Sequence, residues 1–238
     1  MTELLYMKNI EGNYIREFDA TVMKSRDDYV VLDRSAFYPE GGGGQPSDTG
    51  IIEWQGRKTD VVKVTKKGII KHIISGEKPA EGEEVHGVIN WDMRYAHMKM
   101  HTAQHIISGV VYDMYRARTV GNQIHAEYSR VDFHPVNFSA DDLSKIEERC
   151  NDIIRKRAPV RIYEESRSSL EQRVNEERCN LDLLPRSITT LRIVEIEGFD
   201  VCPCAGTHVR NTGEIPPITI LKKEGKGKER ERIVYKLG

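Results

Sequence analysis

Residues 93–115 read MRYAHMKMHTAQHIISGVVYDMY, and this stretch predicts a long α-helix. Its apolar residues recur at intervals of three and four, which is the spacing of a helix that buries one face. Asp92 precedes the stretch and is expected to cap the first turn. The apolar positions that set the period are Met100, Ala103, Ile107, Val110, Val111 and Met114.

The chain ahead of this helix has a different texture. Up to about residue 90, short runs rich in β-branched and aromatic residues alternate with turn residues, a pattern typical of strands. We therefore predict a small antiparallel β-barrel over residues 1–90, with a sandwich as the alternative. The predicted strands are residues 2–9, 14–25, 29–35, 50–56, 58–66, 68–74 and 83–91.

Residues 91–238 are predicted to form an α/β domain with an antiparallel sheet and about three helices, which makes the whole chain α+β. Ser139 and Asp142 have the spacing of a capping box at the start of a second helix, residues 139–157. The apolar stripe of that helix is Leu143, Ile146, Cys150, Ile153 and Ile154. Strands are predicted at residues 122–134, 160–166, 188–198, 218–225 and 230–238, and a short helix at residues 168–177.

The composition is that of an ordinary globular protein, with 38% hydrophobic and 31% charged residues. Lys plus Arg (36) nearly balance Asp plus Glu (37), so the chain as a whole has no field that would attract a polyanion. The sequence contains neither a secretory signal nor a run of 18 apolar residues, and we expect a cytoplasmic protein with no membrane partner. In that compartment the four cysteines do not indicate a disulfide framework, and their thiols are candidates for metal ligation.

Two pairs of metal-ligating residues share one spacing. His101 and His105 are one helical turn apart, so their imidazoles can bind one ion, and His97 extends the same row. Cys204 and His208 have the same separation in the segment DVCPCAGTHV at residues 200–209. Three imidazoles and a thiolate form a donor set that Zn²⁺ accepts, and we predict one zinc site. Cys202 is an alternative thiolate, since it lies two residues from Cys204.

The four ligands by themselves leave two kinds of zinc site open. A closed tetrahedron would describe a structural ion, whereas a catalytic ion needs a position for water or substrate. Structural zinc sites usually occur in small domains that lack a hydrophobic core. This chain is long enough to form such a core, which favours a catalytic ion.

Four consecutive glycines occupy residues 41–44, between FYPE and QPSD. An ordered run of glycines indicates close approach of the backbone to another group, and the flanking prolines favour a fixed conformation over a flexible surface turn. The segment is not a phosphate-binding loop, because no Gly-Lys-Ser/Thr follows and a strand comes next.

Three motifs in this order, FYPEGGGGQPSDTG, NWDMRYAHMKMHTAQHIIS and CAGTHV, resemble the editing domain of alanyl-tRNA synthetases and their free-standing relatives, the alanyl-tRNA editing proteins. The resemblance covers nearly the whole chain. The first residue is methionine, and 238 residues leave no room for a synthetase catalytic domain, so we expect a free-standing protein of the medium-length, glycine-rich type. The family also has a β-barrel followed by an α/β editing domain.

The resemblance implies hydrolysis of the ester that joins a wrong amino acid to alanine tRNA. It assigns zinc to His101, His105, Cys204 and His208, and serine, with glycine as a second possibility, to the misattached residue. In the family the glycine-rich segment covers the editing pocket, which implies substrate-binding roles for Gly42, Gly43, Gly44 and Gln45. Gln45 is also a candidate catalytic residue, and we add Thr207, which lies between the two loop ligands.

Two other functions stay open at this point. A non-catalytic, zinc-stabilised RNA-binding module would use the same ligands, and editing domains of threonyl-tRNA synthetases share the paired HxxxH and CxxxH motifs. The glycine-rich segment favours alanine tRNA over threonine tRNA.

Two local basic clusters could contact the phosphates of tRNA, although each could equally be a solvated surface. Acidic residues dilute the second of them, and the oligomeric state is left open. The clusters are Arg155, Lys156, Arg157 and Arg161, and Lys222, Lys223, Lys226, Lys228, Arg230 and Arg232.

Overall fold

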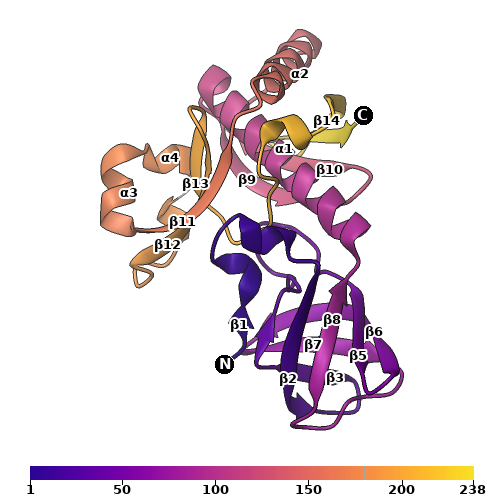
Figure 1. The fold of residues 1–238 in the computed structure, drawn as a ribbon. Helices are drawn as coiled ribbons and strands as arrows, with labels where there is room; N and C mark the ends of the chain where they lie inside the picture. The colour runs from indigo at the N-terminus through magenta and orange to yellow at the C-terminus, as the bar shows by residue number, and fades with distance from the viewer. Residues whose placement is uncertain (180) are drawn as a thin grey trace.

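The computed structural model describes residues 1–179 and 181–238 and has an α+β fold (Figure 1). Its N-terminal part is a closed antiparallel barrel with the strand order β2-β3-β7-β6-β5-β8. The predicted barrel is confirmed. The strands are β2 (Glu17–Ser25), β3 (Tyr29–Leu32), β5 (Gly50–Trp54), β6 (Arg57–Lys67), β7 (Ile69–Ser75) and β8 (Glu84–Ile89).

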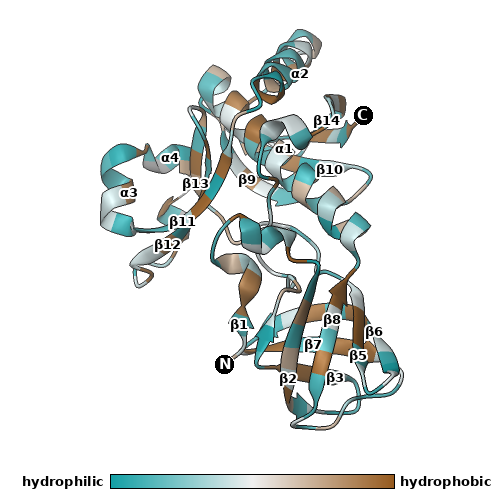
Figure 2. Ribbon diagram, in the orientation of Figure 1, coloured by the Kyte–Doolittle hydropathy of each residue, from teal (hydrophilic) through white to brown (hydrophobic). Residues whose placement is uncertain are grey.

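Alternation of apolar and polar residues explains the barrel, because successive side chains of a strand point to opposite faces. In β2, Phe18, Ala20 and Val22 are buried while Glu17 and Asp19 are exposed. Figure 2 shows the brown, hydrophobic positions along the barrel strands. The inward side chains fill the barrel with a core of its own.

The first predicted strand is largely wrong. Only β1 (Glu3–Leu4) is extended, and it pairs in parallel with β4 (Arg34–Ser35). The chain then turns through two short 3₁₀ helices, η1 (Leu5–Met7) and η2 (Glu11–Tyr14). Residues 2–9 do not alternate as a half-buried strand would, because Leu4, Leu5 and Tyr6 are consecutive and apolar.

The second part begins with the predicted helix, α1 (Trp91–Tyr115). Its N-cap is Asn90 rather than Asp92, because the Asn90 side chain accepts a hydrogen bond from the backbone of Met93. Asp92 lies within the first turn, where a negative charge still suits the helix dipole. The predicted apolar stripe is buried as far as Val111, but Met114 is 41% exposed because the last turn extends beyond the core.

Two antiparallel sheets complete the fold. The larger has the order β14-β15-β10-β9, with β9 (Arg118–Gln123), β10 (Ser129–His134), β14 (Ile218–Gly225) and β15 (Glu231–Leu237). The smaller has the order β11-β12-β13, with β11 (Val160–Ser166), β12 (Thr190–Ile196) and β13 (Asp200–Pro203). The single strand predicted at residues 122–134 is wrong, because the chain reverses there between β9 and β10.

Three further helices are α2 (Ala140–Arg155), α3 (Arg167–Arg173) and α4 (Glu176–Cys179), together with the short turns η3 (Leu181–Leu183) and η4 (Thr212–Glu214). The capping box of Ser139 and Asp142 is confirmed at the start of α2. In the described part of the chain all four cysteines are free thiols. Among the described helices, none has the length and apolar character needed to cross a membrane.

A buried ion pair joins the barrel part to α1. Arg94 on α1 and Asp48 after the glycine-rich segment are 0% and 1% exposed at their side chains. The guanidinium of Arg94 also donates to the backbone oxygens of Asn13 and Ala36. Because β8 ends at Ile89 and α1 begins at Trp91, the change of texture in the sequence coincides with the change of structure, while two domains at 1–90 and 91–238 stay a prediction.

Candidate metal centre

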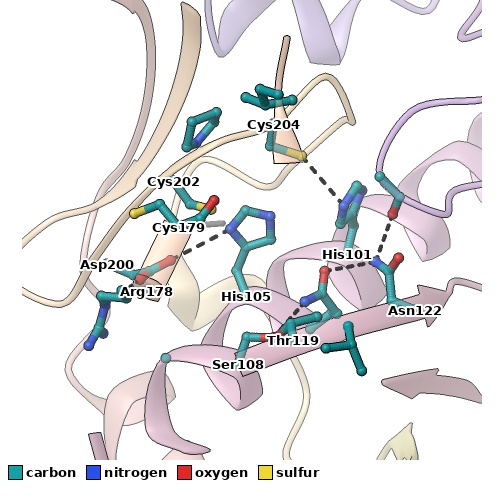
Figure 3. A pocket seen from close by; sticks show the side chains of 17 residues that line it. His101, His105, Ser108, Thr119, Asn122, Arg178, Cys179, Asp200, Cys202 and Cys204 are labelled. Atoms are coloured by element: carbon teal, nitrogen blue, oxygen red, sulfur yellow. Dashed lines mark hydrogen bonds and ion pairs between the residues drawn. The ribbon is translucent and has the colours of Figure 1, made fainter. Parts of the chain in front are cut away.

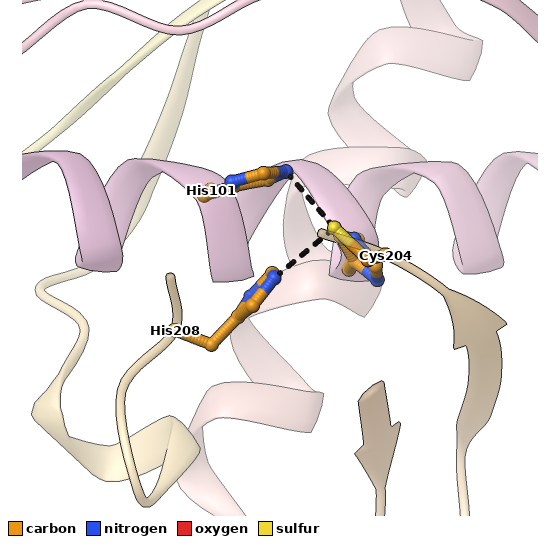
Figure 4. Close-up of side chains that lie close together, drawn as sticks. His101, Cys204 and His208 are labelled. Atoms are coloured by element: carbon orange, nitrogen blue, oxygen red, sulfur yellow. Dashed lines mark hydrogen bonds between the residues drawn. The ribbon is translucent and has the colours of Figure 1, made fainter. Parts of the chain in front are cut away.

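The four predicted ligands lie together. The donor atoms of His101, His105, Cys204 and His208 are all within 4.8 Å of one another, and the three histidines are buried while Cys204 is half-buried. Cys204 Sγ lies 3.6 Å from His101 Nε2 and 3.4 Å from His208 Nε2 (Figure 4). A helix and a distant loop therefore supply one compact set of donors.

Local backbone geometry brings the loop onto the helix. His101 and His105 project from adjacent turns of α1, and Cys204 follows the end of β13. The loop then passes so close to the helix that a Cβ on Gly206 would lie 2.1 Å from His101 Cε1. The backbone of His208 is held by Asn13, whose side-chain oxygen accepts its N–H at 2.7 Å. Glycine is required at residue 206 because any side chain there would displace His101.

The outer nitrogens of the three imidazoles face acceptors, which determines their tautomers. His101 Nδ1 donates to Gln45 Oε1 at 2.9 Å, and His105 Nδ1 lies 3.7 Å from Asp200 Oδ2. His208 Nδ1 lies 3.1 Å from Thr102 Oγ1, whose own proton goes to the Met98 carbonyl. In each ring a proton therefore resides on Nδ1, and Nε2 is the nitrogen that can bind a metal. Hydrogen bonds to the nitrogen that does not bind the metal set the histidine tautomer in the same way in metal sites generally.

The charges of the centre also suit a cation. Burial would raise the pKa of the Cys204 thiol, but the adjacent imidazoles of His101 and His208 outweigh burial and hold this pKa well below its usual value. Burial lowers the pKa of His208, which keeps that imidazole neutral. Thiolate and neutral imidazole are the forms that bind metals, so the residues fit a metal ion.

His105 is the exception. Burial lowers its pKa, but the interactions with Asp200 and Cys204 outweigh burial and raise the pKa to about 10. A metal that binds here must displace a proton from His105, so we expect metal uptake to release protons.

A cavity of about 330 Å³ opens beside the centre, within the usual range of about 300–1,000 Å³ for small-molecule sites. Three of the four candidate ligands line it, namely His101, His105 and Cys204 (Figure 3). The edge strands β9 and β13 and the glycine-rich segment, through Gly43, form other parts of its wall. The metal centre is thus buried in protein on one side and faces open space on the other.

One wall of the cavity carries polar groups that the sequence alone did not single out. Asn122 on β9 donates to the Gly43 carbonyl at 2.8 Å and to Gln104 Oε1 at 3.0 Å. Gln104 in turn donates to Ser108 Oγ at 2.7 Å. Gln104 lies inside the HTAQH motif, which is the signal that could have identified it; Asn122 carries no such signal.

Gln45 and Thr207 lie behind His101 and are not part of the cavity wall. Gln45 Oε1 accepts from His101 Nδ1 and, at 3.1 Å, from the backbone N–H of Thr207. Gln45 Nε2 donates to Thr207 Oγ1 at 2.9 Å. Both residues are buried, and they join the glycine-rich segment to the metal loop.

The glycine-rich segment approaches the centre as predicted. Gly43 and Gly44 have positive φ values of 62° and 73°, and a Cβ on Gly43 would lie 2.7 Å from His101 Cε1. Gly42 packs against Ala205, and Gly44 against Asn122. Close approach of the backbone to neighbouring side chains is therefore the physical reason for the run of glycines.

Two other sequence candidates lie outside the ligand cluster. His97 is buried on α1 one turn before His101 and is not part of the cluster. Cys202 lines the cavity, and its thiol points to the carbonyl of Cys179 at 3.9 Å. Cys204, and not Cys202, is the thiol that the structure groups with the three histidines.

Asp200 is expected to strengthen metal binding by holding His105. Arg178 fixes its carboxylate through a 3.0 Å hydrogen bond, and the charges of His105 and Arg178 lower its pKa against the effect of burial. We expect Asp200→Asn to weaken metal affinity by about 10- to 100-fold, measured by competition with a chelator. Asp113→Asn is the matched control, since Asp113 pairs with Arg178 but not with His105; equal losses in the two variants would contradict the orienting role.

Comparison with known proteins identifies the family. Residues 191–234 match the family model "Threonyl and Alanyl tRNA synthetase second additional domain", and residues 4–93 match "tRNA synthetases class II (A)". The chain is 42% identical over 245 residues to the alanyl-tRNA editing protein AlaX-M of Methanosarcina barkeri, covering 100% of this chain and 99% of that one. It is 37% identical over 235 residues to the alanine–tRNA ligase of Thermococcus kodakarensis, covering 96% of this chain and 25% of the ligase. The chain therefore belongs to the family of alanyl-tRNA editing proteins.

Proposed function

We propose that this protein hydrolyses the ester bond between alanine tRNA and a wrongly attached amino acid, with Zn²⁺ as the cofactor and serine or glycine as the amino acid removed. Family membership supports the reaction class. The structural observation that carries the proposal is the cavity, because three of the four candidate ligands face it. A purely structural ion in an RNA-binding module would not need that open side.

The donor set supports zinc as the metal. His101, His105 and His208 offer nitrogen and Cys204 offers sulfur, a combination typical of zinc sites and unlike the oxygen ligands of Mg²⁺ or Ca²⁺. When bound, a zinc ion supplies Lewis acidity that polarises a carbonyl and lowers the pKa of bound water toward about 7.

The residues of the chain bind and orient the substrate. In the hydrolysis, water adds to the ester carbonyl carbon, the bond to the ribose oxygen breaks, and the amino acid and the free 3′ end of the tRNA are released. Gln104 and Asn122 offer amide groups to the aminoacyl part, and Gly43 lines the same cavity while its backbone packs against His101. Gln45 and Thr207 act in this proposal through His101, whose ring they hold in one tautomer and orientation.

The polar wall supports serine as a substrate. A site that hydrogen-bonds a substrate hydroxyl discriminates against an analogue that lacks it far better than an apolar site does. Gln104 and Asn122 are among the polar groups of the described cavity wall that could hydrogen-bond to such a hydroxyl. Because tRNA is charged and used in the cytoplasm, we place the activity there.

The direct test is deacylation of charged tRNA. We expect the purified protein to release serine from alanine tRNA charged with serine. This release should be at least about 10²-fold faster than release of alanine from alanine tRNA charged with alanine. Threonine tRNA charged with serine is the control for the related threonyl class. Failure to release any amino acid from either tRNA, with the metal bound, would reject the enzymatic proposal in favour of a binding module.

A further inference from the structure

The larger sheet has one face that helices cover and one that they do not. Val131, Phe133, Ile233 and Tyr235 point into the core that contains α1 and α2. Their neighbours along β10, β15 and β14 point the other way. We call the side chains on that side the outer face; its cations are Arg130, Lys222, Lys226, Arg230, Arg232 and Lys236.

The outer face is strongly basic although the chain is nearly neutral. Against these six cations the strands carry two acids, Asp132 and Glu224, and the turn that supplies Lys226 and Arg230 adds one further acid, Glu229, and one further cation, Lys228. Arg232 Nε donates to Asp132 at 2.6 Å, and the ammonium groups of Lys222 and Lys226 both lie 2.8 Å from Glu224. The acids thus hold the cations in an array without cancelling their charge.

The outer face is continuous with the cavity at its edge strand. Gly121 on β9 lines the cavity and lies opposite Asp132, which in turn lies opposite Arg232. A Cβ on Gly121 would lie 3.9 Å from Arg230 Nη2. The row of charges across the sheet therefore begins at the wall of the candidate active site.

Arg230 has unused hydrogen-bonding capacity. Its side chain is 43% exposed and lies 3.7 Å from Asp132, yet its Nε is shielded from water and has no hydrogen-bond partner in the part of the chain that the structure describes. The exposed part of the guanidinium, rather than its shielded Nε, is therefore the part that can donate to a phosphate oxygen.

The other basic cluster of the sequence, Arg155, Lys156, Arg157 and Arg161, differs from the outer face in its ion pairs and in its distance from the cavity. Arg155 pairs with Asp152, and Arg161 pairs with Glu197 at 2.5 Å, so single acids neutralise these cations. None of its residues lines the cavity.

We infer that the outer face binds the phosphate backbone of the acceptor helix of the tRNA substrate, so that the single-stranded 3′ end reaches the cavity past Gly121. The inference rests on the proposed function for its partner. Duplex RNA is bound mainly through its shape and backbone phosphates, and an open sheet with an array of cations suits that mode. Counterion release then makes affinity dependent on salt, by about one unit of log–log slope for each phosphate neutralised.

The test compares two triple variants that each remove three positive charges. Lys222→Gln/Lys226→Gln/Arg230→Gln changes the outer face, and Arg155→Gln/Lys156→Gln/Arg161→Gln changes the other cluster. Binding of uncharged alanine tRNA is measured across a salt series, so the readout does not depend on catalysis. We expect the outer-face variant to bind about 10-fold or more weakly, with a log–log slope reduced by about two to three, and the other variant to bind as the wild type does.

Kinetics separate docking from the proposed function. With seryl-tRNA we expect the outer-face variant to raise KM and leave kcat unchanged, and hydrolysis of 3′-seryladenosine, which lacks the helix, to be unaffected. A wild-type salt slope in the outer-face variant, or a larger loss in the control variant, would overturn the inference. If tRNA binding changes as expected but the wild type releases no amino acid, the docking surface stands and the deacylase proposal fails.

Discussion

Replacing Cys204 by alanine is expected to abolish metal binding and to reduce deacylation by about 10³-fold or more, which corresponds to about 4 kcal/mol of transition-state stabilisation. The thiolate is the only anionic ligand among the four candidates, and its sulfur lies within 3.6 Å of two imidazole nitrogens. Without it three neutral imidazoles remain, which bind a divalent ion less tightly and leave its charge uncompensated. Metal content by elemental analysis and the rate on seryl-tRNA are the two measurements.

The chain offers a close control for this experiment in Cys202. It lies two residues away and lines the same cavity, but its thiol points to Cys179. Cys202→Ala should keep a full complement of metal. Substitution of Co²⁺ gives a third readout, because the thiolate-to-metal absorption band should vanish in Cys204→Ala and persist in Cys202→Ala. The opposite pattern would mean that Cys202 is the ligand.

A second large effect is expected on stability. Arg94→Met should lower the free energy of unfolding by about 3–5 kcal/mol, because it leaves the carboxylate of Asp48 buried without its cation. Chemical denaturation followed by circular dichroism measures the change. Lys63→Met removes one partner of an exposed ion pair with Glu40 and should cost less than about 1 kcal/mol.

The same variant tests a connection between the two parts of the chain. Arg94 donates to the backbone oxygen of Asn13, and Asn13 in turn holds the backbone of the ligand His208. We expect Arg94→Met to weaken metal binding as well. The double variant Arg94→Met/Asp48→Leu removes both charges and should recover much of the lost stability. A double variant no more stable than Arg94→Met would show that the buried charge of Asp48 is not the source of the loss.

The fold was predictable where local pattern and tertiary packing agree. Alternation marked the barrel strands, and a period of three to four marked α1 and α2, because each of these elements buries one face. Prediction failed where a turn interrupts a continuous pattern, as between β9 and β10. There Ser129 exchanges hydrogen bonds with the backbone of His125 to close the reversal, a feature that the alternation does not reveal.

The sequence by itself indicated the four candidate ligands, with Cys202 as an alternative to Cys204, since a spacing of four residues on a helix and a second spacing of four in a glycine-containing loop predict a metal site. Only the tertiary structure decided which groups orient those ligands, which wall faces the substrate and which cations gather beside it. Asp200, Gln104, Asn122 and Arg230 come from four separate elements or turns, and no local pattern relates them. The physical reason is that ligand spacing is a property of one helix or loop. A cavity and a charged face, by contrast, exist only once strands that are distant in the sequence lie side by side.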